Sequence, residues 1–175
     1  MATPNLTPPV VIAFSGNTGA NMCMQAPYAG VDAQITLQPI QWQAPWNNLQ
    51  LWQFGDDGRI YLYTPDALAQ FCVDFPNPAG NGQPILLNTV IPSDQTQLWN
   101  LNVSPQSIAN VGAGGYFIDN DSGNTGPGNK IEIWAGGGAP GNGNEAWMTL
   151  AIPAYYLANV GGAQHAPAHK ATVSR

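Results

Sequence analysis

Two pairs of acidic residues offer the most direct chemistry in this chain of 175 residues. They are Asp56 with Asp57, and Asp119 with Glu132. Glycoside hydrolysis uses two carboxyl groups that lie roughly 5 to 10 Å apart across the scissile bond. Asp57 is followed by Gly58, a dipeptide typical of a turn, which favours a structural role for the first pair. A hydrolase also needs a cleft that excludes water, whereas the architecture inferred below predicts a shallow site, so we expect no enzyme.

The sequence has two histidines, His165 and His169, and we considered both as catalytic or metal-binding residues. Their spacing would place both on one face of a helix, but two ligands do not make a metal site. Both lie in a Gly- and Ala-rich segment, 161–175, that we expect to be a flexible arm. The sequence has no Ser/His/Asp set, P-loop or metal-binding cluster, so we expect neither cofactor nor metal.

The composition excludes several classes of partner. Only 8% of the residues are charged, and 4 Lys and Arg oppose 10 Asp and Glu. Nucleic-acid binding depends on a Lys/Arg patch, and docking on anionic lipid has the same requirement, so we expect neither. No apolar run is long enough for a membrane span, and the N-terminus lacks the basic region of a signal peptide. We therefore expect a cytoplasmic protein, or one released without a signal peptide.

A tryptophan-containing triplet recurs along the chain. Gln50-Leu51-Trp52 returns as Gln97-Leu98-Trp99 and, in a softened form, as Glu145-Ala146-Trp147. Short runs with apolar and polar residues in alternation recur in phase with it, at 22–25, 71–74 and 116–119, and again at 35–38, 85–88 and 131–134. Alternation with period two predicts strands, and clusters of Gly, Asn, Pro and Asp bound them. Fourth strands are expected near 59–63 and 107–110.

Three units of about four strands restrict the architecture. A propeller needs about four to eight such units to close, so three units favour a six-stranded barrel capped by three hairpins. We therefore expect an all-β protein with the β-trefoil fold, three four-stranded repeats related by pseudo-threefold symmetry, in which 10–14 supplies the closing strand. The domain would span 1–160, with lobes at about 15–63, 64–111 and 112–160 and the tail at 161–175. Trp52, Trp99 and Trp147 would be core residues, one in each lobe.

The two cysteines fall at equivalent places in the repeat. Cys23 and Cys72 correspond to one another and to Phe117. A place shared by Cys, Cys and Phe is an apolar core position. We expect two buried free thiols, and a disulfide across the lobes is the alternative.

The three triplets at this spacing resemble the Q-x-W repeats of the ricin-B-type, or R-type, β-trefoil lectins. The resemblance covers about 21–150. It implies a shallow galactose-type site in each lobe: an Asp ending the first strand accepts hydrogen bonds from the sugar, an aromatic residue ending the second strand stacks on the ring, and an Asn precedes the triplet. The Gln of the triplet steadies the Asp. These groups suit a hexose, which has an apolar face and a polar edge.

The third lobe matches this pattern best. The resemblance places Asp119 at the acid position, Trp134 as the platform and Asn144 beside the triplet, with Glu132 facing the sugar. A glycine-rich loop at 136–141, which includes Gly137 and Gly138, would form the rim of the pocket and allow close approach.

The other two lobes depart from the pattern. The second lobe keeps Asp74 and Gln97 but has Asn88 at the platform position and Thr96 in place of Asn, so these residues form only a second candidate site. The first lobe has Gln25, Gln38 and Leu49 at the three positions and is expected to be degenerate. Trp42 and Trp46, in a long first-lobe loop, would cover an apolar patch or offer an unusual contact.

The third triplet begins with Glu145 instead of Gln. A carboxylate cannot donate a hydrogen bond to Asp119 unless it is protonated, and two nearby carboxylates repel each other. Lys130 or an ordered water would relieve the repulsion, or Glu145 would point elsewhere. If the pair is coupled, sugar binding should change between about pH 4 and 7.

The sequence therefore predicts a non-catalytic lectin that recognises glycans ending in galactose or N-acetylgalactosamine. One stacked ring in a shallow site gives an affinity near millimolar, about −4 kcal/mol, so avidity from a homodimer or from multivalent glycans would be needed. The alternative is a β-trefoil protease inhibitor that acts through surface loops such as the proline-rich stretch 74–84.

Overall fold

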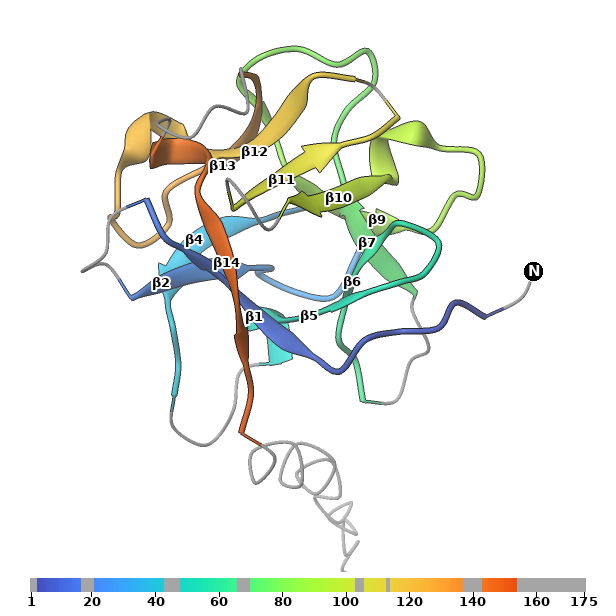
Figure 1. The fold of residues 1–175 in the computed structure, drawn as a ribbon, viewed down its shortest axis with the longest axis horizontal. Coiled ribbons are helices and arrows are strands. Elements are labelled where there is room, and N and C mark those ends of the chain that lie inside the picture. Colours follow the sequence, from blue (N-terminus) through green and yellow to red (C-terminus); the bar gives the residue numbers. More distant parts are fainter. Residues whose placement is uncertain are drawn as a thin grey trace, which may run out of the picture.

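The computed structural model describes residues 3–16, 21–42, 48–65, 70–102, 106–112, 114–136 and 143–153. Within them the chain forms fourteen strands and four short 3-10 helices, with no α-helix. The expectation of an all-β protein is thus confirmed (Figure 1). The tail at 161–175, with His165 and His169, lies outside the described residues, as does Trp46.

The elements follow one another in the same order in each lobe. The first lobe contains β2 (Met22–Gln25), β3 (Ala33–Gln34), β4 (Thr36–Pro39), η1 (Asn48–Gln50), β5 (Leu51–Phe54) and β6 (Ile60–Leu62). The second contains β7 (Phe71–Asp74), β8 (Gln83–Pro84), β9 (Leu86–Thr89), η2 (Gln95–Gln97), β10 (Trp99–Asn102) and β11 (Ser107–Asn110). The third contains β12 (Tyr116–Asn120), η3 (Asp121–Gly123), β13 (Ile131–Ala135), η4 (Gly143–Glu145) and β14 (Trp147–Ala151), and β1 (Val10–Phe14) precedes the first lobe.

β1 completes the third lobe, as the sequence predicts. It runs antiparallel to β14 from the pair Val10 and Ala151 to the pair Phe14 and Trp147. The two strands, from opposite ends of the described chain, lie side by side in Figure 1. In the same way β5 pairs with β6 and β10 with β11. Every lobe therefore ends in an antiparallel pair of strands, and the third borrows its last strand from the N-terminus.

The lobes are joined to one another by a pairing that recurs three times. The last strand of one lobe pairs with the first strand of the next: β1 with β2, β6 with β7, and β11 with β12. The residues opposite each other at these junctions are Ala13 and Cys23, Tyr61 and Cys72, and Ala109 and Phe117. Because the last strand of each lobe is paired with the first strand of the next, the three lobes form a closed ring and these strand edges are not left unpaired.

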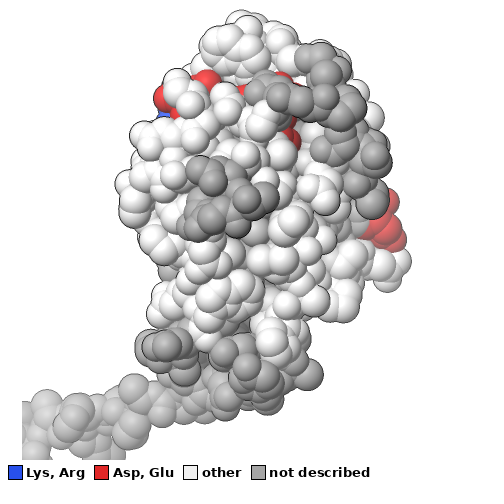
Figure 2. Space-filling view, turned by 60° about the vertical axis from the view of Figure 1, so that its left-hand side comes forward, with Lys and Arg blue, Asp and Glu red and all other residues white. Residues whose placement is uncertain are grey.

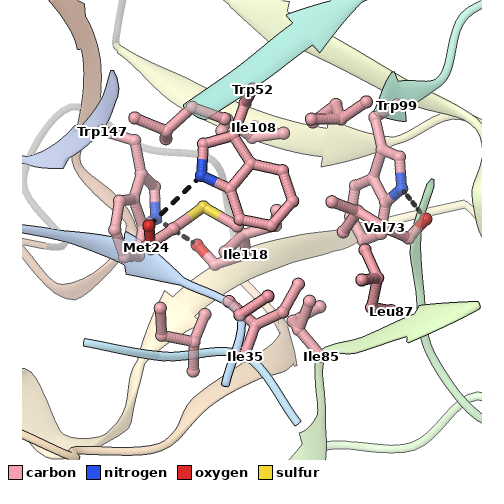
Figure 3. Packing of buried hydrophobic residues seen from close by; sticks show 14 of the residues in the cluster. Met24, Ile35, Trp52, Val73, Ile85, Leu87, Trp99, Ile108, Ile118 and Trp147 are labelled. Atoms are coloured by element: carbon pink, nitrogen blue, oxygen red, sulfur yellow. Dashed lines mark hydrogen bonds between the residues drawn. The ribbon is translucent and has the colours of Figure 1, made fainter. Parts of the chain in front are cut away.

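The three triplet tryptophans form the centre of the core. Trp52, Trp99 and Trp147 are buried, and each indole Nε1 donates a hydrogen bond to a carbonyl oxygen on the first strand of its own lobe. The acceptors are Met24 at 3.2 Å, Val73 at 2.9 Å and Ile118 at 2.9 Å. Figure 3 shows these indoles above the apolar side chains from all three lobes, Ile35 and Ile85 among them. The predicted core role is confirmed, and the repeated hydrogen bond satisfies the one polar atom of each buried indole.

Both cysteines are buried free thiols, as predicted. Burial raises the pKa of Cys23 and of Cys72 to about 12. Cys23 belongs to a second apolar cluster with Val11, Ala13 and Leu51 on the outer side of β1, β2 and β5. Trp42 packs against this cluster and its Nε1 donates to Asn21 Oδ1 at 3.3 Å, so it serves as a cover over an apolar patch.

Among the described residues, no helix is long and apolar enough to cross a membrane. In the same part of the chain, no group of three or more His, Cys, Asp or Glu residues is arranged to hold a metal ion.

Candidate functional site

A hollow of about 240 Å³ opens on the third lobe. It is lined by Asp119, Asp121, Ser122, Glu132, Trp134 and Asn144. All four of the described residues that the sequence placed in the third-lobe site therefore meet in one depression. Gly137 and Gly138, expected on its rim, lie outside the described residues. On the face drawn in Figure 2 most of the surface is uncharged, and acidic atoms show near its upper end and at its right-hand edge.

Strand pairing places the acidic groups and the indole on one side of the lobe. β12 and β13 are antiparallel, with Asp119 opposite Glu132 and Phe117 opposite Trp134. Side chains directly opposite each other lie on the same face, and so do residues two apart along a strand. Asp119, Glu132 and Trp134 consequently share a face. Trp134 lies toward the end of β13 and remains 42% exposed, so its ring is open to a ligand.

The 3-10 helix η3 contributes two residues that the sequence analysis did not select. Asp121 and Ser122 follow β12 directly and enter the lining of the hollow. The chain turns there through two positive φ angles, 56° at Ser122 and 64° at Gly123. A Cβ atom on Gly123 would lie 2.4 Å from Asn144 Oδ1, so a larger residue there would displace η3 or the Asn144 side chain. The Asp-Ser-Gly composition predicts a turn, but it does not say that the turn faces the pocket.

The carboxylate of Asp119 differs from that of Asp74, the buried acid at the same place in the second lobe, which has four donors. Asp119 is 4% exposed, and no described residue donates a hydrogen bond to it. Burial raises its pKa to about 7, helped by the negative charges of Glu145, Glu132 and Asp121. A buried carboxylate normally receives hydrogen bonds that repay the loss of water. Asp119 instead faces a hollow large enough for a ligand with hydroxyl groups.

Lys130 neutralises part of the acidic cluster. Its ammonium group forms an ion pair with Glu132, lies 3.8 Å from Asp121 Oδ2 and donates to the carbonyl oxygen of Gly82 at 3.2 Å. The hydrogen bond to Glu132 raises the pKa of Lys130. Among the described ion pairs, its partners are thus Glu132 and Asp121, and not the Asp119–Glu145 pair that the sequence analysis suggested it would relieve.

The second lobe brings Asp74, Asn88 and Gln97 together, as predicted, but uses all of them in a closed network. Asp74 Oδ1 accepts from the backbone N–H of Phe75 at 2.7 Å and from Thr96 Oγ1 at 2.6 Å. Its Oδ2 accepts from Asn88 Nδ2 at 3.1 Å and from Gln97 Nε2 at 3.2 Å. Four donors occupy the usual capacity of a carboxylate, so little remains for a sugar hydroxyl.

The first lobe has a smaller version of this network. Gln50 Nε2 donates to Gln25 Oε1 and to the carbonyl oxygen of Pro39, both at 2.8 Å, and Gln50 Oε1 accepts from the backbone N–H of Gln41 at 3.0 Å. The acid position holds a neutral amide here, and the platform position holds Gln38, whose Nε2 donates to Thr36 Oγ1 at 3.3 Å. The Gln25 and Gln50 amides therefore bond each other, and Gln38 bonds within its own strand.

The other acidic pair from the sequence, Asp56 and Asp57, is structural. Asp57 Oδ2 accepts from Arg59 Nη1 at 2.9 Å and from the Tyr61 hydroxyl at 2.5 Å. Asp56 accepts from the backbone and side chain of Asn5. The backbone N–H of Gly58 donates to the carbonyl oxygen of Gly55, which confirms the predicted turn.

Comparisons with known proteins identify the fold. No protein-family model matches the sequence, and no curated protein matches it. Solved structures do match. The designed threefold-symmetric protein ThreeFoil gives a TM-score of 0.66 at 12% identity, covering 82% of this chain and 99% of its own. The C-half of the earthworm R-type lectin, in complex with GalNAc, gives 0.63 at 17% identity over 82% and 98%.

The fold is that of the R-type β-trefoil lectins. A non-toxic homologue of type II RIPs from Momordica charantia (bitter gourd), in complex with α-methyl-D-galactoside, gives a TM-score of 0.61 at 14% identity. It covers 84% of this chain and 48% of its own length. The β-trefoil predicted from three triplets and twelve strands is thus confirmed, although at these identities it is the fold and not the ligand that is shared.

Proposed function

We propose that this β-trefoil is a carbohydrate-binding lectin whose third lobe recognises terminal galactose or N-acetylgalactosamine. The observation that carries the proposal is that two side chains line the same hollow: Asp119, a buried carboxylate to which no described residue donates a hydrogen bond, and Trp134, whose indole is exposed. The solved structures of galactoside- and GalNAc-bound β-trefoils support it, since those proteins have the same fold.

The geometry suggests how a hexose would lie. The indole of Trp134 offers a flat apolar surface for the C–H face of the ring, which contributes hydrophobic and dispersion energy. Asp119 accepts hydrogen bonds from ring hydroxyls, and such charge-assisted bonds are about twice as strong as neutral ones. Asn144 adds a donor and an acceptor from η4. A single ring in a hollow of this size should bind weakly, near millimolar or about −4 kcal/mol, so we propose that a homodimer or multivalent glycans supply avidity.

The arrangement supports binding without hydrolysis. Asp119 and Glu132 lie opposite each other on adjacent strands and share one face of the sheet. A glycosidase needs its two carboxyl groups on opposite sides of the scissile bond. Here Glu132 is paired with Lys130, which further favours a binding role.

The protease-inhibitor alternative gains no support. Its proposed loop, 74–84, begins at the buried Asp74 and ends in β8, which pairs with β13 through Pro84 and Gln83. The Gln83 side chain also accepts from Gly80 and donates to the Pro78 carbonyl. Part of the stretch is therefore a fixed strand between two lobes and not an open loop.

Substitution of the platform and the acid tests the proposal. We expect Trp134→Ala and Asp119→Asn each to reduce binding to a galactose- or N-acetylgalactosamine-terminated glycan array at least about tenfold, with the melting temperature retained. Tyr28→Ala is the matched control, because Tyr28 is an exposed aromatic residue on the first lobe. Undiminished binding in both site variants would reject the assignment to the third lobe.

A further inference from the structure

The first residue of the triplet performs the same task in the first two lobes. Gln97 Nε2 donates to the acid of its lobe, Asp74, and to the carbonyl oxygen of Thr89 at 2.9 Å. Gln50 Nε2 donates to the corresponding Gln25 and to the Pro39 carbonyl. In both lobes, then, an amide donor ties the acid position to the end of the lobe's second long strand.

Glu145 stands at this place in the third lobe. It ends η4 as Gln50 ends η1 and Gln97 ends η2, and it is 3% exposed. Its carboxyl group lies against the end of β13, since a Cβ atom on Gly136 would come within 1.9 Å of Glu145 Oε1. A carboxyl group donates a hydrogen bond only when it carries a proton. At this place the third lobe therefore has a carboxyl group, where the second lobe has an amide that donates to Asp74 and the first lobe has an amide that donates to Gln25.

The surroundings of Asp119 are strongly acidic. Glu145 faces it from η4, Glu132 from β13 and Asp121 from η3. Lys130 is the cation recorded beside the cluster among the described residues, and it is occupied by Glu132 and Asp121. The lining of the hollow contains three carboxylates and, among the described residues, no basic side chain. The hollow consequently has an excess of acceptors and of negative charge, next to the open face of Trp134.

We propose that the third-lobe hollow binds hexoses with a protonated amino group more tightly than the corresponding neutral hexoses, and that the acidic groups in and behind its lining, Glu145 among them, are the source of this preference. The inference rests on the proposed lectin function and specifies its ligand class. An ammonium group brings three N–H donors and a positive charge, which are what the acid cluster lacks. A cation near an indole face is attracted as well. N-acetylation removes that charge, and a carboxylated sugar would be repelled by the same cluster.

The preference is measurable with the intact chain and three matched sugars. Titration calorimetry at pH 6.5 and low salt should give a dissociation constant about five- to tenfold lower for galactosamine than for galactose or N-acetylgalactosamine. Added sodium chloride should narrow the difference, because salt screens charge–charge attraction. Ethanolamine, an ammonium compound without a sugar ring, should bind far more weakly than galactosamine.

A conservative variant tests which acidic group causes the preference for galactosamine. Glu145→Gln restores the amide donor found in the other lobes, so at pH 6.5 it should bind galactose at least as tightly as the parent does, while the preference for galactosamine falls. Asp121→Asn, on the exposed side of the hollow, should reduce the preference in part and provides a second variant if Glu145→Gln does not fold. Asp56→Asn, which removes a distant acidic charge at the Asn5 contact, is the control and should leave the preference unchanged.

The outcomes separate this inference from the proposed function. Equal affinities for galactosamine and galactose would overturn the amino-sugar preference and leave the lectin assignment intact. Failure of all three sugars to bind would overturn both. Ethanolamine binding as tight as that of galactosamine would also overturn the inference, because it would indicate a simple cation site. A full preference retained in Glu145→Gln and Asp121→Asn would remove the role given to the acidic cluster.

Discussion

Asp119 and Asp74 occupy the same place in successive lobes and are equally buried, at 4% exposure, but their environments are opposite. Asp74 receives four hydrogen bonds. Asp119 receives none from the described residues and has three acidic neighbours. The same position in the repeat thus has two roles. In the second lobe its carboxylate stabilises the fold, and in the third lobe it can still accept hydrogen bonds from a ligand, which makes the fold less stable. Such local conflict is expected where a protein binds a ligand.

Asparagine substitutions at these two positions should therefore have different effects on stability. Asp74→Asn turns an amide N–H₂ toward two groups that donate, so we expect a loss of about 2 to 4 kcal/mol in the free energy of unfolding. Asp119→Asn removes a repelled charge, and at pH 8 its stability should equal or exceed that of the parent, by up to about 1 kcal/mol. Urea denaturation of both variants checks this, and equal losses would contradict it.

The Asp119 carboxyl should also give stability and ligand binding opposite dependence on pH. Its pKa is about 7 in the folded protein, above the ordinary value of 3.8. The folded state therefore binds more protons than the unfolded chain between about pH 4 and 7, and the stability from this group is full below pH 4 and lost as the pH rises through 7. Galactose binding needs the carboxylate, so its affinity should rise over the same range, by roughly twentyfold from pH 5.5 to 7.5.

Glu145→Gln is the control for this linkage. Removal of the neighbouring charge and addition of an amide donor both lower the pKa of Asp119, so galactose affinity should depend less steeply on pH over this range. Titration calorimetry at several pH values, together with melting curves of the unliganded protein, tests both slopes. A parent protein with pH-independent galactose affinity between 5.5 and 7.5 would contradict the assignment of Asp119 as the acceptor.

The repeat made the fold predictable from sequence because each tryptophan has one role that recurs in phase. Trp52, Trp99 and Trp147 combine large apolar surfaces with a single donor, so burial at equivalent sites is almost the only arrangement that satisfies all three. The alternation of apolar and polar residues predicted where the strands lie, but it did not predict where a strand is interrupted. Ile35 and Ile85 were expected inside strands, whereas each lies between a short strand and a longer one, where its backbone N–H bonds to a neighbouring lobe.

The site was predictable only in part, because side-chain contacts between elements leave no periodic signal. Strand register carried Asp119, Glu132 and Trp134 to one face, and that could be predicted. Asp121 entered the hollow through a turn with positive φ angles, which composition alone does not orient. In the second lobe the residue types were right, but only the structure showed that Thr96 and Gln97 complete the hydrogen bonding of Asp74.

The turn that carries Asp121 should be sensitive to a single methyl group. In Gly123→Ala the new Cβ would lie 2.4 Å from Asn144 Oδ1, so η3 or Asn144 must shift and galactose binding should weaken by about fivefold or more. Gly128→Ala is the matched control, since Gly128 also has a positive φ, of 85°, but its Cβ would meet nothing within 4 Å. Both variants should lose about 1 to 2 kcal/mol of stability from backbone strain, and only Gly123→Ala should lose affinity.

The buried thiols should be chemically inert until the chain unfolds. A pKa of about 12 at Cys23 and Cys72, compared with an ordinary 9.0, leaves roughly a thousandfold less thiolate, and the thiolate is the reactive form. We expect no measurable alkylation by iodoacetamide in native buffer over hours, and stoichiometric alkylation of both residues in denaturant. Mass spectrometry of the two samples distinguishes them. Because the two residues occupy equivalent junctions between lobes, rapid native labelling at either one would indicate that the corresponding junction, β1 with β2 or β6 with β7, opens independently of global unfolding.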